Sequence, residues 1–165
     1  MSKLIIDQYQ NINSMILDQA KDLSPWDGLR LDFDDPYTNN KYIHFLKSQL
    51  IGILTSHDNE LLSFAGFGQD DWFNPYIANI VGSNHNESCF FMYFFTPEKL
   101  RGKGYGKTLY QSIITYLQST GKYQYMNYTT VDINNVTRYK KRGAEQKKKE
   151  NLFDNKKEYY LTHSL

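Results

Sequence analysis

The sequence has few of the residues that mark secreted or metal-binding proteins. Its 165 residues include one cysteine and four histidines, and no Cys/His spacing is typical of a metal site. The single cysteine, Cys89, cannot form an internal disulfide. The first residues show no long apolar core behind a basic head, so we do not expect a secretion signal there. We therefore expect no bound metal and a cytoplasmic location.

Long apolar runs and a strong net charge are also missing. No stretch approaches the roughly 20 apolar residues that a membrane-spanning helix needs. The formal net charge is +1, which argues against a protein whose main task is to neutralise a nucleic-acid backbone, although it leaves room for a local basic patch. We expect neither a membrane nor a nucleic acid as the main partner.

Apolar and aromatic residues, by contrast, are plentiful. Hydrophobic residues make up 40% of the chain, which includes 14 tyrosines and 10 phenylalanines. This content is typical of a globular protein with a real core, and the length fits one ordinary domain. We predict a single domain over residues 1–165.

Hydrophobic periodicity predicts an alternation of strands and helices. In the first half we expect a strand at 3–9, helices at 12–23 and 43–50, and a hairpin of 50–56 with 61–68. Residues 69–87 are expected to be irregular. In the second half we expect a central strand at 88–95, a helix ending near Gly121, a strand at 123–131, a short basic helix at 134–142 and a last strand at 156–163. This order is typical of an α/β sandwich.

The stretch KLRGKGYGKTLYQSII, residues 99–114, holds the most informative motif. It lies between the predicted central strand and the predicted helix that follows. Glycines here let the first N–H groups of a helix reach an anion, and the helix dipole adds to the attraction. The stretch therefore predicts a phosphate-binding loop formed by Arg101, Gly102, Lys103, Gly104, Tyr105, Gly106 and Lys107.

Two nucleotide-binding motifs match this loop incompletely. The dinucleotide fingerprint G-x-G-x-x-G fails because its last position falls on Lys107 or Leu109. The P-loop motif G-x-x-x-x-G-K-[ST] fits at Gly106, Lys107 and Thr108, but its first glycine falls on Arg101. Neither motif accounts for the whole loop.

The run RGKGYG resembles the acyl-coenzyme A signature R/Q-x-x-G-x-G/A of the GNAT superfamily of N-acetyltransferases. The segment NNVTRYKKRGAE resembles a later region of the same family, in which a helix carries a tyrosine followed four residues on by a glycine. In this chain these two residues are Tyr139 and Gly143.

Two positions depart from the family pattern. Asp132 stands where an asparagine is usual, and Ala144 stands where an aromatic residue usually follows the glycine. Asn134 and Asn135 can serve in place of the usual asparagine through a local shift. The motifs cover residues 88–162, whereas the first half of the chain fits only by its order of elements.

The resemblance implies a fold and an activity. The fold is the α/β three-layer fold of GNAT proteins, with a central mixed, mostly antiparallel, twisted sheet flanked by helices. The activity is direct transfer of an acetyl group from acetyl-coenzyme A (acetyl-CoA) to an amine. Longer acyl donors stay open, as does a homodimer.

The resemblance also implies a set of site residues. The end of the central strand would pair with the pantetheine arm, and the N–H of Phe94 or Phe95 would face the thioester oxygen. Tyr139 would donate a proton to the departing thiolate, and Glu87 is the candidate base, directly or through water. The expected coenzyme-binding residues are Phe94, Phe95, Arg101, Gly102, Lys103, Gly104, Tyr105, Gly106, Lys107, Asn134, Asn135 and Tyr139.

Each catalytic assignment has a plainer alternative. Glu87 can be a solvated carboxylate at the end of a strand, and Tyr139 can be a packed aromatic residue. Cys89 has no histidine near it in the sequence, so we expect it to be packed rather than nucleophilic.

The acceptor amine is not specified by the sequence. Carboxylates and aromatic rings that attract ammonium groups occur in two stretches, comprising Asp32, Asp34, Asp35, Asp70, Asp71, Trp72, Phe73 and Tyr76. Solvated loops are the more common explanation for such stretches. A polyamine, an aminoglycoside-like compound, a free amino acid and a protein N-terminus all stay open.

Two further alternatives remain. The basic residues Lys140, Lys141, Arg142 and Lys147, with the two lysines that follow, can form a solvated face or can hold the 3′-phosphate of the coenzyme or an RNA. The whole chain can also be a non-catalytic coenzyme A-binding or interaction module that kept the fold.

Overall fold

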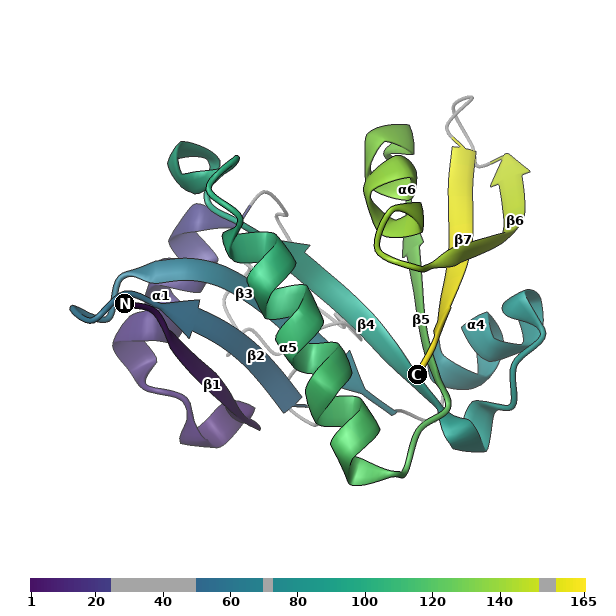
Figure 1. Ribbon diagram of the computed structural model, residues 1–165, viewed down its shortest axis with the longest axis horizontal. Coiled ribbons are helices and arrows are strands. Elements are labelled where there is room, and N and C mark those ends of the chain that lie inside the picture. Colours follow the sequence, from purple (N-terminus) through teal and green to yellow (C-terminus); the bar gives the residue numbers. More distant parts are fainter. Residues whose placement is uncertain (25–49, 70–72, 152–156) are drawn as a thin grey trace, which may run out of the picture. The chain divides into compact units, whose positions relative to one another are not determined.

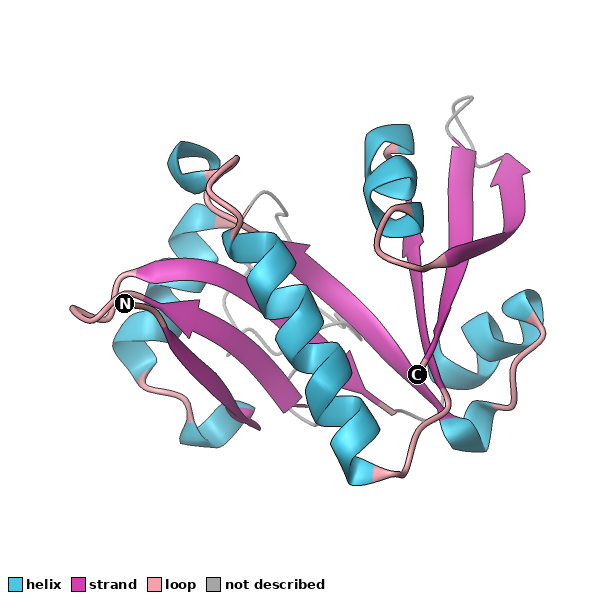
Figure 2. Ribbon diagram, in the orientation of Figure 1, coloured by secondary structure: helices cyan, strands magenta, loops and turns pink. Residues whose placement is uncertain are grey.

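The computed structural model describes residues 1–24, 50–69, 73–151 and 157–165. The strands are β1 (Lys3–Gln8), β2 (Leu50–Thr55), β3 (Leu61–Gly68), β4 (Ser88–Phe95), β5 (Tyr125–Thr130), β6 (Glu145–Asn151) and β7 (Lys157–Ser164). The helices are α1 (Ser14–Leu23), α4 (Phe73–Val81), α5 (Tyr105–Thr120) and α6 (Ile133–Lys140), with 3₁₀ turns η1 (Tyr9–Asn11), η2 (His85–Glu87) and η3 (Glu98–Leu100) (Figure 1, Figure 2).

The strands form one mixed sheet with the order β1-β2-β3-β4-β5-β7-β6. The β4–β5 pair is parallel, whereas the pairs β1–β2, β2–β3, β5–β7 and β6–β7 are antiparallel. The predicted α/β fold with a mixed, mostly antiparallel sheet flanked by helices is confirmed.

The chain divides into two compact units. Unit 1 comprises Met1–Phe67 and Tyr93–Ile113, and unit 2 comprises Gly68–Met92 and Ile114–Leu165. Strand β4 and helix α5 each contribute residues to both units. A single domain over residues 1–165 stays a prediction.

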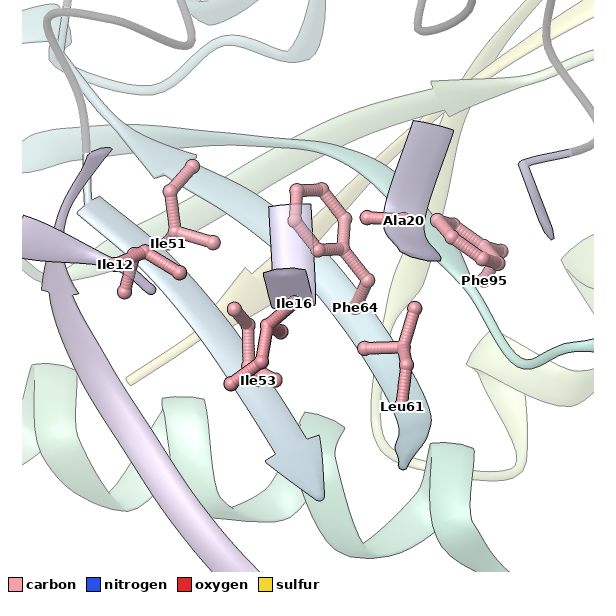
Figure 3. Packing of buried hydrophobic residues seen from close by; sticks show 8 residues of the cluster. All are labelled: Ile12, Ile16, Ala20, Ile51, Ile53, Leu61, Phe64 and Phe95. Atoms are coloured by element: carbon pink, nitrogen blue, oxygen red, sulfur yellow. The ribbon is translucent and has the colours of Figure 1, made fainter. Parts of the chain in front are cut away.

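The core of unit 1 lies between α1 and one face of the β2–β3 hairpin. The spacing of Ile12, Ile16 and Ala20 puts these residues on one face of the N-terminal segment, where all three are buried. The ring of Phe95, the last residue of β4, lies 5.6 Å from that of Phe64, measured between centroids. The cluster therefore anchors the end of β4; it consists of Ile12, Ile16, Ala20, Ile51, Ile53, Leu61, Phe64 and Phe95 (Figure 3).

Helix α5 covers the opposite face of the same hairpin. Gly52 lies between two core isoleucines of β2, so its missing side chain would point away from α1. A Cβ on Gly52 would stand 2.7 Å from Cδ1 of Ile113 in α5. The glycine thus lets α5 approach the strand closely, and unit 1 has its strands between two helices.

Unit 2 has the same layering. Asn127 and Tyr128 are successive residues of β5, so their side chains point to opposite faces. Asn127 Nδ2 donates a hydrogen bond to Ser83 Oγ, just beyond α4, at 2.8 Å. The Tyr128 ring meets that of Tyr139 in α6, with centroids 4.6 Å apart. Helices α4 and α6 therefore cover opposite faces of the strands in unit 2.

One expectation about secondary structure was wrong, and one strand was not predicted. Residues 69–87 are not irregular throughout, because α4 occupies Phe73–Val81, with Ile77, Ala78 and Val81 buried. Pro75 lies in the first turn of this helix, where proline is tolerated. No element was predicted for residues 145–151, which form β6, the edge strand beside β7.

The other described elements agree with the expectations to within a few residues. The strand, the helix and the hairpin predicted in the first half are found as β1, α1 and the β2–β3 pair. The helix expected at 43–50 lies outside the described residues up to residue 49, and Leu50 begins β2. In the second half, β4, α5, β5, α6 and β7 lie where the periodicity predicts them.

Candidate functional site

The pairing of β4 changes along its length. Its ladder with β5 runs from Ser88 opposite Tyr125 to Phe90 opposite Asn127, and the described register ends there, although β4 continues to Phe95. Tyr93 has a φ of 51°, which is uncommon for a residue with a side chain and bends the strand. The bend comes directly before Phe94 and Phe95, two of the predicted site residues.

A short turn leads from β4 to the glycine-rich loop. After Thr96 and Pro97 the chain forms η3, and the loop begins at Arg101. Arg101 Nε donates a hydrogen bond to the carbonyl oxygen of Thr96 at 3.3 Å. The guanidinium group thus ties the start of the loop to the end of β4.

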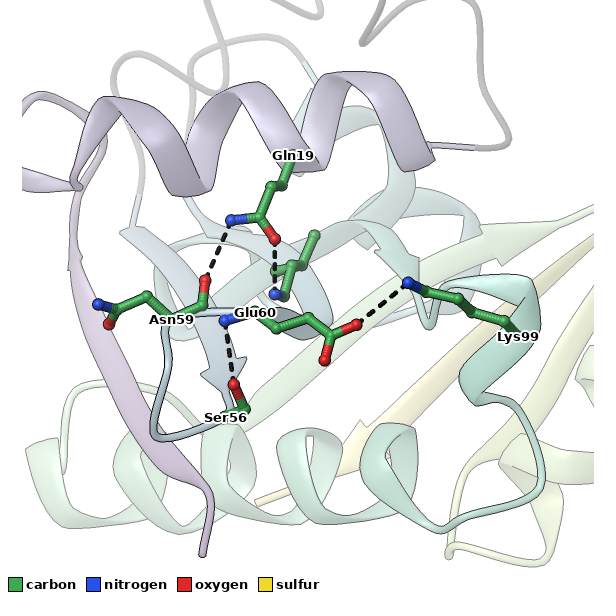
Figure 4. A network of polar contacts seen from close by, with 6 residues as sticks. Gln19, Ser56, Asn59, Glu60 and Lys99 are labelled. Carbon is green, nitrogen blue, oxygen red and sulfur yellow. Dashed lines mark hydrogen bonds and ion pairs between the residues drawn. The ribbon is translucent and has the colours of Figure 1, made fainter.

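The hairpin turn of unit 1 also contacts η3. Gln19 of α1 donates from Nε2 to the carbonyl of Asn59 at 3.0 Å and accepts from the N–H of Leu61 at 2.9 Å (Figure 4). Glu60, between them, forms an ion pair with Lys99 of η3 at 3.1 Å. This pair is exposed, so its contribution to the stability of the fold is small.

The three glycines of the loop are needed for different structural reasons. Gly102 and Gly104 have φ values of 81° and 88°, which side chains with a Cβ rarely adopt, and a Cβ at either position would meet nothing within 4 Å. A Cβ on Gly106 would instead stand 2.9 Å from Thr96 Oγ1 and 3.4 Å from Cζ of Phe94. Gly102 and Gly104 shape the turn, and Gly106 allows α5 to lie against the end of β4.

The loop delivers the chain into the N-terminus of α5. The first α5 hydrogen bond runs from Thr108 N–H to the carbonyl of Gly104 at 3.0 Å. The N–H groups of Tyr105, Gly106 and Lys107 precede it, in the turn where an α-helix offers donors without intrahelical acceptors. These amides, together with the dipole of a 16-residue helix, form the kind of cradle that holds a phosphate group.

The side chains around this cradle suit a diphosphate. Arg101, Lys103 and Lys107 are exposed. Open space around the Cα atoms of Gly102 and Gly104 leaves the loop backbone accessible. The residues present therefore fit the pyrophosphate of coenzyme A.

The predicted residues of α6 lie in unit 2 and are held by local hydrogen bonds. Asp132 caps the helix, because its Oδ1 accepts from the N–H of Asn134 at 2.8 Å. Aspartate caps a helix as well as asparagine does, so Asp132 still caps α6 although an asparagine is usual at this position in the family. Asn135 Oδ1 accepts from Arg138 Nη1 at 2.9 Å, and the side chain of Asn134 is exposed.

Tyr139 is buried on the inner face of α6. Its exposed fraction is 8%, and its ring packs edge-on against Tyr128. This packing holds the ring in one orientation, which a proton donor needs and a purely structural tyrosine also shows.

Glu87 is the last residue of η2 and directly precedes β4. Its backbone carbonyl accepts from the N–H of Gln124 at 2.7 Å, and its carboxylate Oε1 accepts from Gln124 Nε2 at 3.1 Å. Phe94 is seven positions further along the chain, a span of at most roughly 23 Å in a fully extended strand. The carboxylate thus has a structural partner near the β4–β5 junction.

Cys89 is fully buried in β4, and this burial raises the pKa of its thiol. A thiol with a raised pKa is a poor nucleophile at neutral pH. The expectation of a packed cysteine agrees with this environment.

The basic residues of β6 are partly engaged. Lys147 pairs with Glu145, Lys148 pairs with Glu150, and the ammonium group of Lys149 lies 5.6 Å from the centroid of the Tyr159 ring. Lysines on an edge strand also discourage pairing with other chains.

The structure groups the predicted site residues by unit. In unit 1 it brings together the end of β4, the glycine-rich loop and the first turn of α5. Asn134, Asn135, Tyr139 and Glu87 belong to unit 2. Of the acceptor candidates, Tyr76 is exposed, whereas residues 32, 34, 35 and 70–72 lie outside the described residues and the side chain of Phe73 is not described.

Sequence reasoning missed three residues of this region. Tyr93 bends β4, Thr96 lies beneath Gly106, and Ser63 of β3 contacts the end of β4. The pair Thr96–Pro97 before the loop was a weak signal for a turn. Nothing in the sequence connects Ser63 to residues more than thirty positions away.

The described residues also bear on two other classes of site. They contain no group of three or more His, Cys, Asp or Glu side chains that could hold a metal ion. None of the described helices is long and apolar enough to cross a membrane.

The sequence matches the family model described as "Acetyltransferase (GNAT) family" over residues 14–143. The chain therefore belongs to the GNAT acetyltransferase family, a family of transferases. A search of curated proteins finds no significant match.

Solved structures share the fold at low sequence identity. The ribosomal-protein-S18-alanine N-acetyltransferase of Escherichia coli matches with a TM-score of 0.68 at 10% identity, covering 99% of this chain and 94% of that one. An acetyltransferase of Bacillus subtilis in complex with CoA matches with a TM-score of 0.65 at 17% identity, covering 99% of both chains. A GNAT acetyltransferase of Streptococcus pneumoniae has a TM-score of 0.64 at 11% identity, covering 99% and 100%.

Proposed function

We propose that the protein is an N-acetyltransferase that moves an acetyl group from acetyl-CoA directly to a primary amine of a small molecule or peptide. The observation that carries this proposal is the loop 101–106, which leads into the N-terminus of α5. Two of its glycines have positive φ values, and the third is closely packed against neighbouring side chains. Acetyl-CoA supplies an activated acetyl group as a thioester. The structure of a related fold in complex with CoA supports this choice of cosubstrate.

The end of β4 is proposed to bind the other end of the cosubstrate. The β4–β5 ladder stops at Phe90, so an extended pantetheine arm can continue the hydrogen bonding along β4 as an added strand. The bend at Tyr93 turns the amides that follow it. We assign the N–H of Phe94 or Phe95 to the thioester oxygen, where negative charge develops as the amine attacks.

Tyr139 is proposed as the proton donor to the departing thiolate. A phenol hydroxyl is a common general acid, since it carries a proton that it can donate to a developing anion. Its buried, edge-packed ring supports a fixed orientation of the hydroxyl group.

Glu87 is proposed as the base that removes a proton from the amine. Its hydrogen bond from Gln124 leaves the second carboxylate oxygen available to accept a proton. Because Glu87 precedes β4, this role requires a water-mediated path. Glu87→Gln tests the role: activity should fall most at low pH, where the amine is most strongly protonated.

The acceptor is proposed to be a cation at neutral pH. Tyr76 on α4 is 55% exposed and offers an aromatic face for an ammonium group. Polyamines, aminoglycoside-like compounds, free amino acids and protein N-termini are the candidate classes. We also propose a cytoplasmic location, because a chain with a single cysteine cannot form an internal disulfide.

Thiol release from acetyl-CoA in the presence of a panel of these amines tests the proposed function. We expect release that depends on both the amine and the enzyme, and loss of that release in Gly104→Val. Binding of acetyl-CoA without amine-dependent release from any member of the panel would favour the alternative, a non-catalytic coenzyme A-binding or interaction module.

A further inference from the structure

A buried hydroxyl of β3 contacts the peptide group at which β4 ends. Ser63 has no exposed surface, and its Oγ donates a hydrogen bond to the carbonyl oxygen of Phe95 at 2.9 Å. The same Oγ lies 3.2 Å from Oγ1 of Thr96, the next residue. Phe95 and Thr96 lie between the proposed thioester end of the site and the glycine-rich loop.

The chemistry of the two hydroxyl groups settles which one donates in each contact. A serine hydroxyl has one proton, and Ser63 uses it on the Phe95 carbonyl. In the contact between the two hydroxyls, Thr96 must therefore donate and Ser63 must accept. The result is a directed chain from Thr96 through Ser63 to the Phe95 carbonyl, and such chains strengthen cooperatively in a buried setting.

Both peptide groups around Thr96 are held by a specific donor. Ser63 fixes the carbonyl of Phe95, and Arg101 Nε fixes the carbonyl of Thr96. Fixing the first carbonyl also fixes the N–H on the other side of the same peptide plane. The direction in which the chain leaves β4 is thereby set from β3 on one side and from the loop on the other.

The same threonine sets the position of α5. A Cβ on Gly106 would stand 2.9 Å from Thr96 Oγ1. The first turn of α5 therefore packs directly against this oxygen atom. A change in the Ser63–Thr96 contact therefore reaches the amides of the cradle directly. Ser63 is the one residue of β3, LLSFAGFG, whose side chain can donate or accept a hydrogen bond.

We propose that Ser63 is a positioning residue for the acyl-coenzyme A site, acting through Thr96 to hold the end of β4 and the first turn of α5 in binding geometry. This inference rests on the proposed function, because it assigns the purpose of that geometry to acetyl-CoA. Ser63 itself does not touch the cosubstrate in this account.

Two matched variants of Thr96 isolate its hydroxyl. Thr96→Ser and Thr96→Ala both lose the methyl group, and only the alanine variant loses the donor to Ser63. We expect Thr96→Ser to bind acetyl-CoA as the parent does and Thr96→Ala to bind about threefold more weakly. Ser63→Ala removes the whole chain and should weaken binding by about tenfold, since one net hydrogen bond corresponds to a few-fold change in affinity.

Thr55→Val serves as the control for loss of a hydroxyl in the same unit. Thr55 of β2 is fully buried, and within the described part of the chain its Oγ1 has no hydrogen-bond partner. Its replacement by an isosteric residue removes a buried hydroxyl without breaking a bond. We expect unchanged affinity for acetyl-CoA and a thermal midpoint at or above that of the parent.

A second readout does not depend on acetyl-CoA at all. The backbone amide resonances of Gly104 and Gly106 report the geometry of the cradle in the free protein. We expect them to shift in Ser63→Ala and Thr96→Ala, and to stay in place in Thr96→Ser and Thr55→Val.

The outcomes separate the positioning role from the proposed function. A folded Ser63→Ala with parental affinity and parental glycine resonances would overturn the inference, as would a lower thermal midpoint with no change in either readout. If the parent protein fails to bind acetyl-CoA, the proposed function fails; shifted resonances would then still support the positioning of α5 by Ser63, and unshifted ones would overturn it.

Discussion

Thr96 Oγ1 lies 2.9 Å from the point where a Cβ on Gly106 would stand. The distance is shorter than side-chain carbons tolerate, so the glycine and the threonine are matched to each other. Phe94 also contacts this position, because its Cζ lies 3.4 Å from the same point. The Phe94 ring lies 6.1 Å from the ring of Tyr110 in α5, measured between centroids. The last residues of β4 and the start of α5 therefore form one packed joint beneath the anion cradle.

Gly106→Ala should disturb this joint. The added methyl group displaces either α5 or the Thr96 side chain, which we expect to lower the free energy of unfolding by about 1–3 kcal/mol and to weaken acetyl-CoA binding. Chemical denaturation and calorimetry measure the two effects. In the double variant Gly106→Ala/Thr96→Ala the oxygen is gone, so the two losses should combine to less than their sum; strict additivity would show that the contact is unimportant.

Asn127 should be the most sensitive polar residue in unit 2. It is fully buried, donates to Ser83 Oγ at 2.8 Å and accepts from Thr162 Oγ1 at 2.7 Å. Asn127→Leu removes both bonds and leaves Thr162 unpaired, so we expect a loss of about 2–4 kcal/mol in the free energy of unfolding. Adding Thr162→Val should restore part of it, and an Asn127→Leu variant as stable as the parent would contradict this account.

His163 gives the protein a pH-dependent contribution to stability. Burial lowers the pKa of its imidazole below the ordinary 6.5, so the unfolded chain binds the proton more readily than the folded one. Stability should fall as the pH drops from 7 through about 6.5 toward the folded pKa, and rise in the other direction. His163→Asn should flatten this slope, measured by thermal unfolding between pH 5 and 8, and a slope equal to that of the parent would contradict this account.

Tyr139→Phe should separate a proton donor from a packed ring. The phenylalanine keeps the edge contact with Tyr128, so folding and acetyl-CoA affinity should stay at parental values. Turnover should fall on the order of 10²-fold, as loss of a general acid commonly causes. Parental turnover, measured where chemistry limits the rate, would show that water or another residue donates the proton.

The fold could be predicted from the sequence where its signals are local. Apolar periodicity located α1, the β2–β3 pair, β4 and α5, because these elements bury a face or a whole strand. It also located β1, whose residues are at most partly buried. Strand β6 has no apolar residue in EQKKKEN and exists because β7 offers it a partner, so no local signal predicts it. Helix α4 carries Asn74 and Pro75 in its first turn, and these residues are typical of a turn as well as of a helix start.

The candidate site, like the fold, could be predicted only where its signals are local. The glycine-rich loop follows from a motif whose chemistry is local, and the structure gives two of its glycines the positive φ values that the motif needs. Ser63 and Thr96 could not be found in this way, because their role comes from a contact between residues 33 positions apart. The bend at Tyr93 likewise comes from the surrounding sheet rather than from the residue's own preference.

The affinity of Gly104→Val for acetyl-CoA, compared with that of Gly121→Val by isothermal calorimetry, tests the central claim most directly. Both glycines have positive φ values, 88° and 61°, and a Cβ at either would meet nothing within 4 Å, so both variants should lose about 1–2 kcal/mol of stability through backbone strain. Gly104 directly precedes α5 at the proposed cradle, and Gly121 follows the C-terminus of the helix. The account predicts that Gly104→Val weakens binding at least about tenfold while Gly121→Val binds as the parent does; parental affinity in a folded Gly104→Val would contradict it.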